Sequence, residues 1–67
     1  MTALEAIRDA MSLGELAISH RLDGEKDKAA AAFTQAYQAA DQLGPLSLTA
    51  QAIHVALEDA ERAEVPA

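Results

Sequence analysis

Alanine is the residue that most constrains how this chain can fold. The 67-residue sequence contains 17 alanines, which make up half of its apolar residues. A buried methyl group contributes little, whereas each larger apolar side chain contributes about 1.5–3 kcal/mol when it is fully buried. A chain of this length is already near the lower limit for a fold with a single core. We therefore predict one small domain over residues 1–67, with a composition that favours burial against another chain.

The spacing of the apolar residues predicts the secondary structure. They recur at intervals of three and four, no segment alternates with a period of two, and Val and Ile do not cluster. The sequence therefore predicts an all-α fold. We expect three helices, over residues 3–22, 26–43 and 46–63, with the first two forming an antiparallel αα-hairpin and the third packing against it as a capping helix.

Local signals define where these helices begin and end. Thr2 and Glu5 have the spacing of a capping box at the start of the first helix. Gly24 is suited to the left-handed residue that ends it. The third helix has two possible starts, because Ser47 is a good N-cap and Pro45 is equally suited to the first helical turn.

One apolar stripe on each helix is expected to form the core. On the first helix the stripe consists of Leu4, Ile7, Met11, Ile18 and Leu22. On the second helix it consists of Ala29, Phe33, Ala36, Ala40 and Leu43, with Tyr37 at its margin. On the third helix it consists of Ala50, Ile53, Leu57 and Ala60.

Four further apolar residues lie outside these stripes. At 100° per residue, Leu13 and Leu16 point away from the stripe of the first helix, and Leu48 and Val55 point away from that of the third. Because a closed three-helix bundle needs only one stripe per helix, we predict that these four side chains contact another chain. Isolated exposed leucines are also common on soluble proteins, and that reading stays open.

Half of the chain resembles a known repeat. From Leu13 it reads L-x-x-L-A-x-x-H, followed by A-x-x-x-F from Ala29 and then by Ala36. Over about residues 10–43 this resembles the tetratricopeptide repeat, with the signature W-x₂-L-G-x₂-Y…A-x₃-F…P. The resemblance implies two closely packed antiparallel helices, a third helix that belongs to an incomplete second repeat, and binding of peptides or partner proteins. One repeat does not bury its own faces, so the resemblance also implies stacking on another chain.

The chain departs from the repeat signature at several positions. Leu13 replaces the tryptophan, Ala17 the glycine, His20 the tyrosine and Asp41 the proline. An unrelated αα-hairpin within a three-helix bundle therefore remains an alternative. No basic residues form a peptide-clamping pattern, so the resemblance implies no particular ligand.

Charge and composition bear on location and partners. The chain has 11 acidic and five basic residues and no cysteine. The excess of acidic residues opposes binding to nucleic acid or to anionic membrane surfaces. Glu5, Arg8 and Asp9 interrupt the amino-terminal apolar run, and no stretch is long enough for a membrane span. We therefore expect a cytoplasmic protein.

The sequence contains few residues suited to catalysis or metal binding. His54 and Glu58 are four residues apart on one helix, but a metal site needs three or four ligands. His20 and Asp23 flank the end of the first helix, and nothing in the sequence brings them near His54. We predict no metal site, no cofactor and no enzymatic activity.

These inferences lead to a prediction about function. The sequence predicts a non-catalytic interaction module that docks through apolar helix faces, either on a second copy of itself or on another protein. Two alternatives are an accessory subunit of a larger enzyme and a small structural component of a phage or another multimeric assembly.

Overall fold

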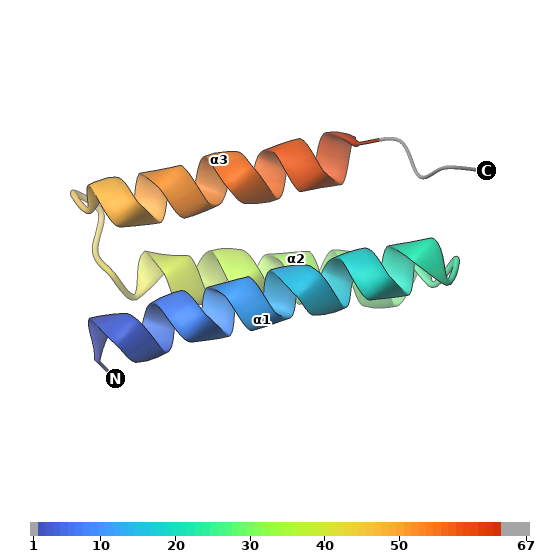
Figure 1. Cartoon of the computed structure of the whole chain (residues 1–67), viewed down its shortest axis with the longest axis horizontal. Coiled ribbons are helices and arrows are strands. Elements are labelled where there is room, and N and C mark those ends of the chain that lie inside the picture. The colour runs from blue at the N-terminus through green and yellow to red at the C-terminus, as the bar shows by residue number, and fades with distance from the viewer. Residues whose placement is uncertain (1, 64–67) are drawn as a thin grey trace.

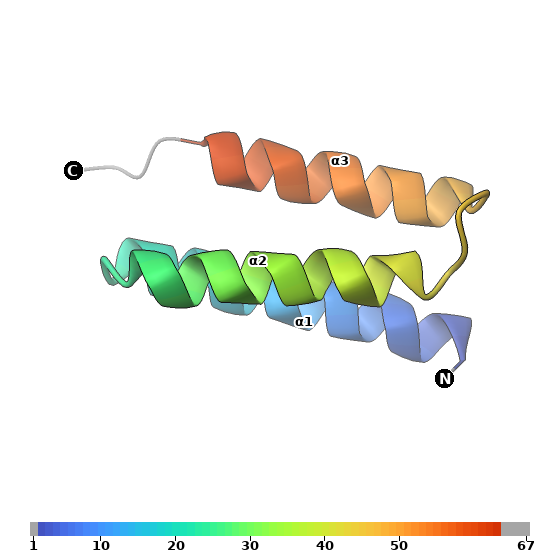
Figure 2. The same cartoon turned by 180° about the vertical axis from the view of Figure 1, so that it is seen from behind.

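The computed structural model describes residues 2–63 and consists of three α-helices, with no strand among these residues. They are α1 (Ala3–Leu22), α2 (Lys26–Asp41) and α3 (Leu48–Arg62). Helices α1 and α2 form an antiparallel hairpin, and α3 runs beside it in the direction of α1 (Figures 1 and 2). The predicted all-α class and the arrangement of a hairpin with a third helix are confirmed.

The helix ends follow the local signals in the sequence. The Thr2 hydroxyl accepts a hydrogen bond from the Glu5 backbone N–H at 3.2 Å and caps α1. The Ser47 hydroxyl accepts one from the Ala50 N–H at 3.1 Å, so Ser47 rather than Pro45 begins α3. Gly24 has φ of 80°, a conformation that glycine adopts without a steric penalty. The predicted bounds of α1 are confirmed, whereas α2 ends at Asp41 and α3 runs from Leu48 to Arg62. Residues 1 and 64–67 lie outside the described residues.

A seam of small residues joins α1 to α2. The residues of α1 that are buried are Ala6, Ala10, Gly14 and Ala17. The residues of α2 that are buried are Ala29, Ala32, Phe33, Ala36 and Ala40. Because almost all of these side chains are methyl groups or hydrogen, the two backbones approach closely, and these two helices form the most extensive contact in the molecule. Ala29, Phe33, Ala36 and Ala40 of α2 belong to the core stripe predicted for that helix, and Phe33 supplies the one large side chain among those buried in α1 and α2.

The predicted core stripe of α1 is wrong. Leu4, Met11, Ile18 and Leu22 are between 41% and 60% exposed, and Ile7 is only partly buried. The small residues lie on a face of α1 about 100° away from this stripe, and it is this face that packs against the alanines of α2. Large side chains at the seam would hold the two backbones apart. The close contact therefore selects the small face of α1 and leaves its most apolar stripe outside.

Helix α3 rests on the hairpin through a few larger side chains. Ala50 and Leu57 are buried, and Ile53, Ala60 and Tyr37 pack against the same core, as the sequence predicts. Leu57 also reaches α1, where a Cβ atom on Gly14 would lie 3.0 Å from its Cδ2 atom. The helix contacts α2 more than α1. This unequal contact leaves a groove on the α1 side of α3.

Candidate interaction site

An apolar groove of about 230 Å³ runs between α1 and α3. On the α1 side it is lined by Ala10, Met11, Gly14, Glu15 and Ile18. On the α3 side it is lined by Ile53, Ala56, Leu57 and Ala60. Glu15 is the one charged residue in this lining. Covering this surface with an apolar helix is favourable, because it removes apolar area from water and desolvates few polar groups.

The two walls of the groove differ in side-chain size. The α1 wall is bordered by the exposed stripe of Leu4, Met11, Ile18 and Leu22, here called the α1 ridge. All four α3 residues that line the groove are apolar, and two of them are alanines, Ala56 and Ala60. The face therefore combines a ridge of large side chains with a neighbouring strip of small ones, which is the pattern that helix packing of ridges into grooves requires.

Two opposite charges border the α1 ridge. Arg8 and Glu15 are seven residues apart, so they lie on the same edge of the helix, about 10 Å from each other along its axis. Both side chains are exposed, and neither forms an ion pair with another residue between positions 2 and 63. The border of the α1 ridge thus carries one charge of each sign, without an ion-pair partner among residues 2–63.

The four residues predicted to contact another chain do not form one patch. Leu13 is partly buried and packs against the core, whereas Leu16 is 48% exposed. Leu48 and Val55 lie on the outer side of α3, about 160–180° around the helix from buried Leu57. Whether these four residues contact a partner stays a prediction. The α1 ridge was missed as a surface because its residues had been assigned to the core.

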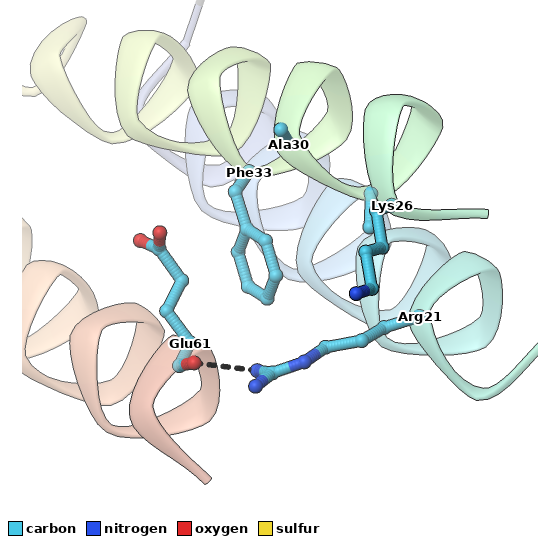
Figure 3. A pocket seen from close by; sticks show the side chains of 6 residues that line it. Arg21, Lys26, Ala30, Phe33 and Glu61 are labelled. Atoms are coloured by element: carbon cyan, nitrogen blue, oxygen red, sulfur yellow. Dashed lines mark hydrogen bonds between the residues drawn. The ribbon is translucent and has the colours of Figure 1, made fainter. Parts of the chain in front are cut away.

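Arg21 fastens the end of α3 to α1. Its guanidinium donates a hydrogen bond to the backbone carbonyl of Ala60 at 2.8 Å. It donates a second one to the backbone carbonyl of Glu61 at 2.5 Å (Figure 3). These carbonyls belong to the last turn of α3, where the helix itself provides no donor. A cation at a helix C-terminus also favours the helix dipole. The pocket around Arg21 is about 160 Å³ and also includes Lys26 and Phe33. No feature of the sequence indicated this contact.

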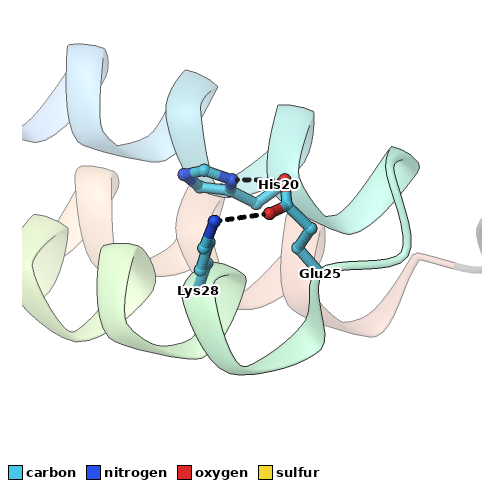
Figure 4. A network of polar contacts seen from close by, with 3 residues as sticks. All are labelled: His20, Glu25 and Lys28. Atoms are coloured by element: carbon cyan, nitrogen blue, oxygen red, sulfur yellow. Dashed lines mark hydrogen bonds and ion pairs between the residues drawn. The ribbon is translucent and has the colours of Figure 1, made fainter.

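Polar contacts join the helices at two further places. Glu25 lies in the α1–α2 turn. Its carboxylate is 3.1 Å from His20 Nδ1 and forms an ion pair with Lys28 Nζ at 2.7 Å (Figure 4). The pKa of Glu25 is lowered most by the hydrogen bond from Lys28 and next by the hydrogen bond with His20. Between α2 and α3, His54 Nε2 lies 2.7 Å from Asp41 Oδ1, and the His54 ring packs at a tilt against the Tyr37 ring, with the centroids 4.9 Å apart. These contacts hold the turn and the α2–α3 interface.

The titration of Tyr37 reflects its place in this interface. Its hydroxyl donates a hydrogen bond to the Glu61 carboxylate. Burial, together with this hydrogen bond and the negative charge of Glu61, raises the pKa of Tyr37 to about 12. Both histidines considered as metal ligands are instead paired with one carboxylate each, and residues 2–63 contain no group of three or more His, Asp or Glu side chains that could hold a metal ion.

Comparison with protein-family models, with curated proteins and with solved structures finds no match for this chain. The resemblance to a tetratricopeptide repeat stays a prediction. Among the described residues, no helix combines the length and the apolar character that crossing a bilayer requires.

Proposed function

We propose that this protein is a non-catalytic interaction module that self-associates through the α1–α3 face. The observation that carries the proposal is the α1 ridge: four large apolar side chains, each 41–60% exposed, follow one stripe beside an apolar groove. Such contiguous exposed stripes mark surfaces that another chain covers.

A second copy is the occupant that fits this face. Ridge and groove lie next to each other on the same face, so a two-fold axis covers the ridge and the groove of each copy with the same face of the other. The interface of such a dimer is made twice from one surface. A heterologous partner would need only one of the two features.

The distribution of charge is consistent with self-association of an acidic chain. The net charge of -6 opposes the approach of two copies. Within the groove lining, however, Glu15 is the sole charged residue. Most of the like charge therefore lies on other faces, where distance and salt weaken the repulsion.

Sedimentation of the purified chain over a concentration series tests this proposal. We expect a dimer, and we expect Met11→Asp to convert it to a folded monomer, because Met11 is 59% exposed and at the middle of the ridge. Substitution of so exposed a residue changes monomer stability by only about 0.5 kcal/mol. Circular dichroism verifies that the variant keeps its helices.

Two matched variants act as controls. Leu46 is 90% exposed and lies in the connection between α2 and α3, away from the groove lining, so Leu46→Asp is expected to leave the dimer intact. Val55→Asp probes the outer side of α3. A monomeric wild-type chain contradicts the proposal and favours the alternative role of accessory subunit. Loss of the dimer with Val55→Asp but not with Met11→Asp transfers the interface to the outer side of α3.

A further inference from the structure

We infer that the second copy binds in an antiparallel orientation, with a two-fold axis that crosses α1 near Met11 and Ser12, and with Arg8 of each copy paired to Glu15 of the other. This inference rests on the proposed self-association and defines its geometry. It assigns a role to the two charges that border the ridge and that have no partner within the described chain.

The sequence positions of the charges select the antiparallel orientation. Arg8 and Glu15 are equidistant from a point between Met11 and Ser12. A two-fold axis at this point brings Arg8 of one copy opposite Glu15 of the other, and it does so twice. In a parallel pair each residue lies opposite the same residue of the other copy, so Arg8 lies opposite Arg8 and Glu15 lies opposite Glu15. Like charges at such neighbouring positions are destabilising.

The apolar residues of the ridge are compatible with the same axis. Leu4 and Ile18 lie seven residues on either side of Met11. The axis therefore places the two Met11 side chains near each other and brings Leu4 of each copy opposite Ile18 of the other. All three are more than 40% exposed in the single chain. The dimer covers each of them with an apolar neighbour.

The location of the axis also gives the greatest overlap. It crosses α1 close to the middle of its 20 residues, so the two helices pair over almost their full length of about 30 Å. Leu4 of the second copy then reaches the end of the groove that is lined by Ile18. Ridge and groove are occupied by the same antiparallel contact.

Reversing each charge separately tests the pairing. Arg8→Glu places two acidic pairs in the antiparallel dimer, and Glu15→Arg places two basic pairs. We expect each single variant to raise the dimer dissociation constant roughly tenfold in low salt. The double variant Arg8→Glu/Glu15→Arg restores both pairs with opposite sign and is expected to dimerise like the wild type.

The Glu15→Arg variant separates specific pairing from net charge. It makes each chain less acidic by two charges, so a general reduction of repulsion would strengthen the dimer. Weakening is expected only if residue 15 lies opposite Arg8. A wild-type dimer that neither single variant weakens overturns the antiparallel pairing while leaving self-association in place, whereas a monomeric wild type contradicts the proposed function itself.

Disulfide cross-linking provides a second readout, because the chain has no cysteine of its own. In the antiparallel dimer the Leu4 positions of the two copies are roughly 20 Å apart along the helix axis, too far for a disulfide. We expect Leu4→Cys alone to give no cross-linked dimer, and an equimolar mixture of Leu4→Cys with Ile18→Cys to give a mixed one. Cross-linking of Leu4→Cys with itself would show a parallel pair and overturn the inference.

Discussion

The α1–α2 seam and the attachment of α3 use opposite means to hold helices together. At the seam, alanines face alanines and the backbones approach closely. At α3, buried Leu57 and partly buried Ile53 and Tyr37 make the contact, and Arg21 fastens the helix end. The first contact is broad and made of small groups, and the second depends on a few large ones.

This difference has a consequence for the surface. Close contact through methyl groups uses the small face of α1 and displaces its large apolar residues to the outside. Helix α3 then covers α2 more than α1, and the α1 ridge stays exposed along the groove. The protein therefore gains a tight hairpin and, by the same choice of face, an exposed apolar surface on α1.

The largest expected effect comes from shortening Leu57. Leu57→Ala removes the buried side chain on which α3 rests and should lower the free energy of unfolding by about 2–5 kcal/mol. Because α3 depends on few contacts, hydrogen exchange should accelerate most in α3. Val55→Ala is the matched control, since Val55 is exposed on the same helix. An equal acceleration in all three helices would show that α3 is no more loosely held than the hairpin.

A larger side chain in the α1–α2 seam tests whether this contact depends on small residues. Ala36 is fully buried between α1 and α2, so Ala36→Leu should separate the backbones and cost about 1–3 kcal/mol in urea unfolding. Ala31→Leu adds the same side chain at an exposed position of α2 and should change stability by no more than about 0.5 kcal/mol. A neutral Ala36→Leu variant would be incompatible with a close seam.

A smaller effect is expected at the end of α3. Arg21→Gln removes the charged donor that bonds the carbonyls of Ala60 and Glu61, and should cost about 1 kcal/mol. Lys26→Gln is the control, because Lys26 lines the same pocket without an ion pair to residues 2–63. Amide exchange in the last turn of α3 should become faster in Arg21→Gln but not in Lys26→Gln. Equally faster exchange in Lys26→Gln would mean that the effect comes from losing a positive charge in the pocket and not from losing the Arg21 hydrogen bonds.

The smallest expected effect is a pH dependence at Tyr37. Its pKa in the folded chain is about 12, above the value of about 10 for an exposed tyrosine. The folded state therefore favours the protonated phenol, so this contribution to stability is fully present below about pH 10 and is lost as the pH rises toward 12. Urea unfolding at alkaline pH should show this decrease in the wild type and less of it in Tyr37→Phe. Identical pH profiles would mean that Tyr37 titrates alike in both states.

The sequence predicted the helices because their signals are local. A hydroxyl three residues before a backbone N–H, as in Thr2 and Ser47, and a glycine at a left-handed position, as in Gly24, act within one helical turn. Phe33 and Leu57 were correctly predicted to lie in the core, since each lies on the apolar stripe of its helix. Arg21 could not be linked to α3 in advance, because the contact joins residues about 40 positions apart.

The buried face of α1 was decided only by the tertiary structure. The helix has two faces suited to burial, one with Leu4, Met11 and Ile18 and the other with alanines and Gly14, and hydrophobicity alone favours the first. The choice depends on the facing helix: α2 presents alanines, and two small faces allow a closer approach than a small face and a large one. Amino-acid composition fixes how apolar each face is, but the distance between the helix axes determines which face is covered.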